Sequence, residues 1–150
     1  MILLARKCIL LYNTYALKIM FFLGDLMAKV SVSFELRSSE GSSTIKTKGL
    51  LQRKQLIFYD ESKTKHVLSI EENRLNYVKK DAQTMDFSFQ KTILEKGYYH
   101  VGNYQFSFDI KTKKLVIEPN KIEVEYDVLN DDELVNSVYF KLIYKQLEEI

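Results

Sequence analysis

Cysteine, proline, glycine and histidine are scarce in this sequence of 150 residues, and tryptophan is absent. The one cysteine, Cys8, excludes a disulfide framework and makes the cytoplasm the expected compartment. With one proline and five glycines, the chain must form its turns mostly from Asn, Asp, Ser and Lys. It has no glycine-rich phosphate loop and no Gly-x-Ser-x-Gly nucleophile elbow. We therefore expect a protein that is not an enzyme.

The two histidines and the balance of charge exclude two further classes of site. His66 and His100 have no second histidine or carboxylate at a ligand-like spacing, so we expect neither a metal site nor a cofactor. We expect His66 to cap a strand end and His100 to lie in the core or at its rim. The formal net charge is +2, and basic and acidic residues are equal in number from Met27 onward. Nucleic acid is not an expected partner, because its binding proteins usually concentrate a basic excess on one face.

The chain does have a two-residue alternation of apolar and polar side chains, which runs from Met27 to Tyr144. Successive side chains of a strand point to opposite faces, so the alternation predicts antiparallel sheet with one buried face. Turn signals recur about every 8–12 residues, which is typical of a sandwich or barrel. The expected strands, about ten in number, cover residues 29–37, 44–52, 55–59, 66–70, 74–79, 83–92, 98–101, 104–111, 113–118, 121–129 and 136–146.

Two local features refine this prediction. Gly49, inside a strand, indicates a bulge or a sharp bend, and residues 93–97 are expected to form a loop or a helical turn. An open sheet of this size would leave long edges exposed to aggregation. We therefore expect a single antiparallel up-and-down β-barrel of about eight to ten strands.

The first 26 residues differ from the rest, because their apolar runs are interrupted by charged and polar residues. A secretory signal would need a small-residue cleavage site, and a transmembrane helix of about 20 apolar residues would contain Lys18. A helix packed on the domain is a third interpretation. We favour a fourth, in which translation starts at Met27 and residues 1–26 are a non-domain extension from an over-extended gene start. Residues 27–150 then form one soluble β-barrel domain with no expected membrane contact.

Large side chains dominate the inward face that the alternation predicts, namely Phe34, Met85, Phe87, Phe89, Phe106, Phe108, Tyr126 and Phe140. A barrel of about eight strands is either filled by such side chains or has room for one small ligand. Two functions follow: binding of a small, partly apolar ligand inside, or a protein-interaction or structural module with a filled core. The candidate ligand-binding residues are these aromatics and polar-tipped residues near strand ends: Phe87, Phe89, Phe106, Phe108, Tyr126, Arg74, Tyr99, His100 and Tyr104.

Carboxylates alternate along one of the last strands, at Glu123, Glu125 and Asp127. If the last two strands form a hairpin, these side chains share a face with Lys141 and Lys145. Opposite charges across a ladder contribute roughly 0.2–1 kcal/mol each, so we interpret the set as a solvated charge ladder and not as an acid–base pair.

The order of several short segments resembles a known family. The segments are Thr47-Lys48-Gly49, Leu56-Ile57-Phe58-Tyr59-Asp60-Glu61, Met85-Asp86-Phe87, Tyr99-His100-Val101 and Ile122-Glu123-Val124-Glu125-Tyr126-Asp127. From Met27 to Tyr144, the chain is similar to the YwiB-like family of small bacterial proteins. That resemblance implies a lipocalin-like (calycin) β-barrel and implies no particular activity. The chain departs from the family pattern at Lys80-Asp81-Ala82 and at Val101, where polar positions of the family are replaced.

Overall fold

The computed structural model describes residues 27–147, and they form strands joined by turns and short loops. The strands are β1 (Ala28–Ser38), β2 (Gly41–Gln52), β3 (Gln55–Tyr59), β4 (Lys65–Ile70), β5 (Leu75–Lys80), β6 (Gln83–Phe89), β7 (Glu95–Val101), β8 (Tyr104–Glu118), β9 (Lys121–Asn130) and β10 (Glu133–Gln146). Each strand pairs antiparallel with the next, and β1 pairs with β10, which closes the barrel. The predicted all-β, up-and-down barrel is confirmed. The predicted extension, residues 1–26, lies outside the described residues.

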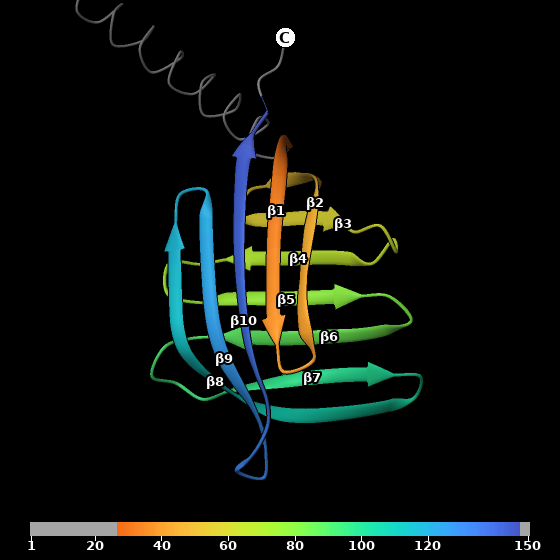
Figure 1. Ribbon diagram of the computed structural model, residues 1–150, viewed down its shortest axis with the longest axis vertical. Coiled ribbons are helices and arrows are strands. Elements are labelled where there is room, and N and C mark those ends of the chain that lie inside the picture. Colours follow the sequence, from red (N-terminus) through yellow and green to blue (C-terminus); the bar gives the residue numbers. More distant parts are fainter. Residues whose placement is uncertain (1–26, 148–150) are drawn as a thin grey trace, which may run out of the picture.

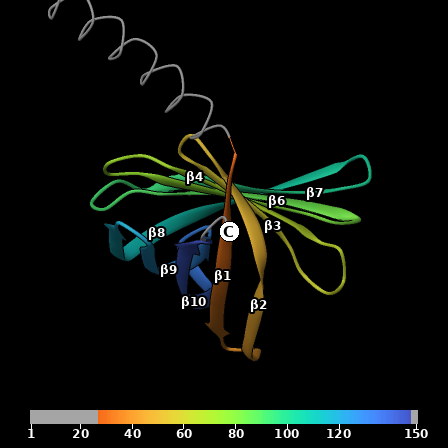
Figure 2. The ribbon, with the colours of Figure 1, turned by 90° about the horizontal axis from the view of Figure 1, so that it is seen from above.

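The barrel is flattened into two layers whose strands run in crossing directions (Figures 1 and 2). One layer contains β1, β2, β9, β10 and the second half of β8, and the other contains β3 to β7. Two strands belong to both layers. β2 pairs with β1 along its length but with β3 only through residues 49–52. β8 pairs with β7 through residues 104–110 and with β9 through residues 109–118.

Both shared strands have a feature that allows the chain to change layer. A Cβ at Gly49 would lie 2.7 Å from the carbonyl oxygen of Ile57, so only glycine permits β2 to approach β3 this closely. In β8 the register shifts between Thr112 and Lys114. A bulge of this kind bends a strand and increases its twist. The prediction of two strands separated by a turn at residues 111–113 was therefore wrong.

The core is built mainly from aromatic rings that both layers contribute. Phe140 of β10 is fully buried and packs against four rings, those of Phe34, Tyr77, Phe89 and Tyr126. Ring centroids lie 5.5 Å apart for Phe34 and Phe140 and 4.5 Å apart for Phe89 and Tyr126. Burying a side chain of this size contributes about 1.5–3 kcal/mol. The inward face was predicted correctly for Phe34, Phe89, Tyr126 and Phe140, and also for Met85 and Phe87.

The hairpin of β7 and β8 differs from its prediction in two ways. Phe106 is 53% exposed, although it was predicted to lie in the core. It pairs with Tyr99 and shares a face with the half-buried Phe108, but the opposite layer does not cover that part of the hairpin. β7 begins at Glu95, within the segment predicted to be a loop or helical turn, and β6 ends at Phe89 instead of continuing to residue 92.

The predicted charge ladder on the outer face is present, with different partners. Glu123 lies opposite Lys141, as predicted, but its ion pairs are with Lys114 at 2.9 Å and Lys121 at 3.8 Å. Lys145 lies opposite Ser31 of β1 and not beside β9. The hydrogen bond from Lys114 lowers the pKa of the Glu123 carboxyl. Such exposed pairs contribute little stability, about 0–1 kcal/mol each.

Candidate functional site: a hollow at the barrel mouth

The barrel interior is filled around Phe140 and hollow at one opening. Two adjoining cavities, of about 410 Å³ and about 300 Å³, lie where the β1–β2 and β9–β10 turns face the ends of β5, β6 and β7. The cavities share three lining residues, Leu36, Tyr77 and Lys79. We call this shared opening the mouth. Its size falls in the range of small-molecule sites, about 300–1,000 Å³.

The larger cavity of the mouth has polar and apolar surface in nearly equal parts. One wall is the stretch of β2 from Ser43 to Thr47, whose outer side does not pair with β3. The opposite wall is the turn after β3, from Tyr59 to Ser62. Phe34 and Ile45 provide apolar surface. This cavity therefore offers hydroxyl, carboxylate and backbone groups beside apolar surface of similar extent.

The smaller cavity is mostly aromatic and apolar. Phe87 packs edge-on against Tyr99 and Tyr126, with ring centroids 5.6 Å and 6.1 Å apart, and Tyr99 packs edge-on against Phe108 at 6.2 Å. The Phe87 ring packs directly on the backbone of β7 at Gly97, where a Cβ would lie 2.6 Å from the Phe87 Cδ1 atom. Such edge-to-face pairs fix ring orientation. The cavity wall is thus preformed.

Three polar side chains are connected beneath the larger cavity. His66 Nε2 lies 3.0 Å from Asp60 Oδ2, and His66 Nδ1 lies 2.6 Å from the Tyr77 hydroxyl. Asp60 is fixed in turn by the Thr64 amide, which donates to Oδ1 at 3.0 Å. A carboxylate only accepts hydrogen bonds, so Nε2 carries the histidine proton and donates it to Asp60. In neutral histidine Nδ1 then accepts the hydrogen bond that the Tyr77 hydroxyl donates.

Burial controls the protonation of these three hydrogen-bonded side chains. His66 is only 2% exposed and stacks on Phe58, with ring centroids 4.6 Å apart. Burial lowers the pKa of His66, and the neighbouring Asp60 carboxylate offsets this only in part. Burial alone would raise the pKa of Asp60, but the hydrogen bonds from His66 and Thr64 outweigh it and lower that pKa. Burial raises the pKa of Tyr77 well above its ordinary value. The group is therefore ionised at Asp60 and neutral at His66 and Tyr77 near neutral pH.

The mouth collects four of the nine predicted ligand-binding residues. Phe87, Tyr99, Phe108 and Tyr126 line the smaller cavity. Phe89 lies deeper, fully buried against Tyr126 and Phe140. Three predicted residues are exposed on the β7–β8 hairpin: Phe106, His100 and Tyr104. His100 was predicted to be a core or rim residue, and its exposure places it outside the core.

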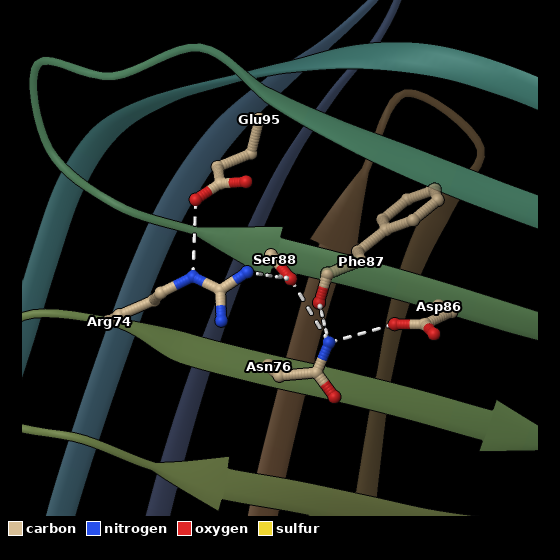
Figure 3. A network of polar contacts seen from close by, with 6 residues as sticks. All are labelled: Arg74, Asn76, Asp86, Phe87, Ser88 and Glu95. Atoms are coloured by element: carbon tan, nitrogen blue, oxygen red, sulfur yellow. Dashed lines mark hydrogen bonds and ion pairs between the residues drawn. The ribbon is translucent and has the colours of Figure 1, made fainter.

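Arg74, the ninth predicted residue, lies at the opposite end of β5 from the mouth (Figure 3). Its Nε donates to Glu95 at 3.1 Å and its Nη2 donates to Ser88 at 3.1 Å. Asn76 Nδ2 donates to Asp86 Oδ1 at 2.8 Å and also contacts Ser88 Oγ at 3.1 Å. β6 and β7 pair only through residues 83–86 and 98–101, so this network spans the gap that opens beyond them. Arg74 therefore has a structural role there.

Sequence reasoning missed two components of the mouth. His66 was predicted to cap a strand end, but it lies in the core between Asp60 and Tyr77. Lys79 was not singled out, although it falls two and four residues after the buried Tyr77 and Leu75 and so shares their inward face. That spacing was a usable signal. Within residues 27–147, no group of three or more His, Cys, Asp or Glu side chains is placed to hold a metal ion.

Comparison with known proteins decides the family. A family model described as "Domain of unknown function (DUF1934)" matches residues 29–142, more than half of the chain. The chain belongs to this family. A solved structure with a similar fold, the crystal structure of ywiB protein from Bacillus subtilis, has a TM-score of 0.62 and 12% sequence identity, covering 85% of this chain and 99% of that one. The resemblance to YwiB-like proteins and their lipocalin-like barrel is thereby confirmed, and at this identity the likeness concerns the fold alone.

No curated protein matches the sequence. Over residues 27–147, the structure has no helix of the length and apolar character needed to cross a membrane.

Proposed function

We propose that this protein binds one small, partly apolar molecule in the mouth of the barrel and does so without catalysing a reaction. The single observation that carries the proposal is the pair of adjoining cavities, together about the size of an ordinary ligand site, in an interior that is otherwise filled by aromatic rings. We place the function in the cytoplasm, in keeping with a chain that has one cysteine. Nucleic acid and membranes are not among the partners we propose.

The lining supports a ligand with both apolar and polar parts. The smaller cavity presents Met85, Phe87 and Phe108 to an apolar body. The larger cavity presents hydroxyl groups and the Asp60 turn to polar atoms. Large apolar walls with a few placed polar groups are typical of small-molecule sites.

The side chains with acid–base chemistry favour binding over catalysis. A general base works best with a pKa near the operating pH. Burial lowers the pKa of His66 and raises that of Tyr77, and each side chain is already committed to the other by a hydrogen bond. Their role in this proposal is to hold the wall of the mouth in one conformation.

A fluorescence titration tests the proposal. N-phenylnaphthylamine is neutral and gains emission in apolar surroundings, so its emission should rise and saturate with this protein. Leu36→Trp places a large ring where both cavities meet and should abolish the rise. Ile143→Trp is the matched control, because Ile143 is exposed on the outer face of β10. Saturable binding that Leu36→Trp leaves unchanged would place the dye elsewhere and refute the proposal.

A second function, protein interaction through a strand edge, is favoured by one observation. β2 pairs with β3 only through residues 49–52, which leaves the outer side of residues 41–48 without a neighbouring strand. An extended peptide can add to such an edge through main-chain hydrogen bonds. The exposed Lys46 and Lys48 oppose pairing between two copies and favour an acidic partner. A peptide of alternating Val and Glu should slow amide hydrogen exchange of residues 42–48, and unchanged exchange would reject this function.

A further inference from the structure

Three polar groups of the mouth have no partner in the described part of the protein. Within residues 27–147, no carboxylate lies within ion-pair distance of the Lys79 ammonium, and the Tyr99 and Tyr126 hydroxyls make no hydrogen bond. Tyr126 is only 4% exposed, yet its hydroxyl is not among the atoms enclosed by protein, so it opens into the cavity. A polar group at the surface of an open cavity pairs with water or with a ligand that displaces the water. These three groups are therefore available to a ligand.

Lys79 points toward the same space. It lies on the inward face of β5 with Leu75 and Tyr77, and it lines both cavities. It is half-buried, whereas its neighbour Lys80 is exposed on the outer face. A lysine on the inward face of a barrel loses part of its hydration, which an anionic partner would replace.

The two tyrosines act as donors at neutral pH. Burial raises the pKa of Tyr99 and of Tyr126, so both keep their protons. A protonated hydroxyl and an ammonium group that line the same cavity suit an acceptor that carries negative charge, because hydrogen bonds to ionised groups are the stronger ones.

We propose that the ligand is a small monoanion, with a carboxylate held by Lys79, Tyr99 and Tyr126 and an apolar body against Phe87 and Phe108. This inference rests on the proposed function and adds the chemical class of the ligand. Both parts of the ligand lie in the smaller cavity, which Lys79, Tyr99, Tyr126, Phe87 and Phe108 all line.

The acidic side chains near the mouth are either hydrogen-bonded to other residues or exposed to solvent. Both carboxylate oxygens of Asp60 are used, by the Thr64 amide and by His66. Glu40, Glu61 and Asp81 are exposed, so water and salt weaken their effect, and the charges of Asp81 and Glu40 add only to the burial that raises the pKa of Tyr99.

The test compares three compounds that share one apolar body: phenylbutyrate, phenylbutyramide and phenylbutylamine. Each competes against bound N-phenylnaphthylamine, and calorimetry measures each directly. We expect phenylbutyrate to bind about tenfold more tightly than the amide or the amine, as a charged hydrogen bond in a half-buried site allows. Lys79→Met should remove this preference, and Tyr126→Phe should reduce it. Lys80→Met and Tyr98→Phe, on the outer faces of β5 and β7, are matched controls and should keep it.

The outcomes separate this inference from the proposed function. If the dye binds but the three compounds compete equally, or if Lys79→Met keeps the preference, the anion site is refuted and ligand binding in the mouth stands. A tighter amine would also refute it and would point to the rim carboxylates. If neither the dye nor any of the three compounds binds, both ligand binding in the mouth and the anion site are refuted.

Discussion

A substitution at Gly97 of β7 tests the packing of the Phe87 ring that lines the mouth. A Cβ at this position would lie 2.6 Å from Cδ1 and 2.8 Å from Cε1 of Phe87, and 2.9 Å from Cδ1 of Ile110. Contacts this short force a movement. Ile110 is fully buried, so the Phe87 ring is the side chain with space beside it, namely the smaller cavity. We therefore expect Gly97→Ala to push the Phe87 ring into the mouth.

Two opposing terms set the magnitude of the effect. Overpacking a core by a methyl group costs about 1–3 kcal/mol. Replacing glycine by alanine stabilises by about 0.4–1 kcal/mol, because it reduces the conformational entropy of the unfolded chain. The net expectation is that Gly97→Ala lowers the free energy of unfolding by about 1–2 kcal/mol.

A double-mutant cycle with Phe87→Val isolates this contact, because valine has neither of the two ring atoms. Urea unfolding followed by circular dichroism gives the four free energies. In the Phe87→Val background, Gly97→Ala should cost at least about 1 kcal/mol less than in the wild type. The single variant should also weaken binding of N-phenylnaphthylamine. If Gly97→Ala is as stable as the wild type, or if the two substitutions are additive, the Phe87 ring does not pack directly on the β7 backbone at Gly97.

Three further predictions concern the core, the bulge and the buried histidine. Phe140→Ala should lower the free energy of unfolding by about 3–5 kcal/mol in urea melts, whereas the exposed Phe106→Ala should change it by less than about 0.5 kcal/mol; similar losses would contradict the placement of the two rings. Thr112→Val should raise the melting temperature and stabilise by about 1 kcal/mol, because the buried Thr112 hydroxyl has no partner; a loss would contradict this. Folding lowers the pKa of His66. In the unfolded chain His66 takes up a proton at its ordinary pKa of about 6.5, whereas in the folded chain it stays neutral to lower pH. The free energy of unfolding should therefore fall as the pH drops below about 6.5. Urea melts of His66→Gln across this range should show a smaller fall and those of the exposed His100→Gln an unchanged one; the reverse order would reject the assignment.

The strands and most of the inward face could be predicted because both depend on local alternation. Phe34, Phe87 and Phe140 follow the two-residue period and are buried. Alternation gives the face of a residue but not the extent of the opposite layer. Phe106 is on the expected face, yet it is exposed because the β7–β8 hairpin extends beyond that layer. The sequence has no local signal for that length.

The bent strand β8 could not be predicted for a related reason. Residues 111–113 have the polar composition of a turn, but here they form the bulge at which one strand passes from β7 to β9. The distinction depends on the pairing of both halves with strands that are distant along the chain.

The hydrogen-bonded group of Asp60, His66 and Tyr77 depends in the same way on strands that are distant along the sequence. Alternation puts His66 on a face with Leu68, and Tyr77 with Leu75. Their hydrogen bond also requires that β4 and β5 pair in a particular register, which the sequence does not specify. Lys79 differs, because its two-residue spacing from Tyr77 is enough to place it on the inward face of β5.

The most direct measurement of ligand binding in the mouth uses the methyl groups of methionine. Met85 lines the smaller cavity, and Met27 is 68% exposed before β1. In protein labelled with ¹³C at methionine methyl groups, titration with N-phenylnaphthylamine should shift the Met85 resonance until the site saturates and leave that of Met27 in place. A saturating ligand that does not move the Met85 resonance would contradict the account.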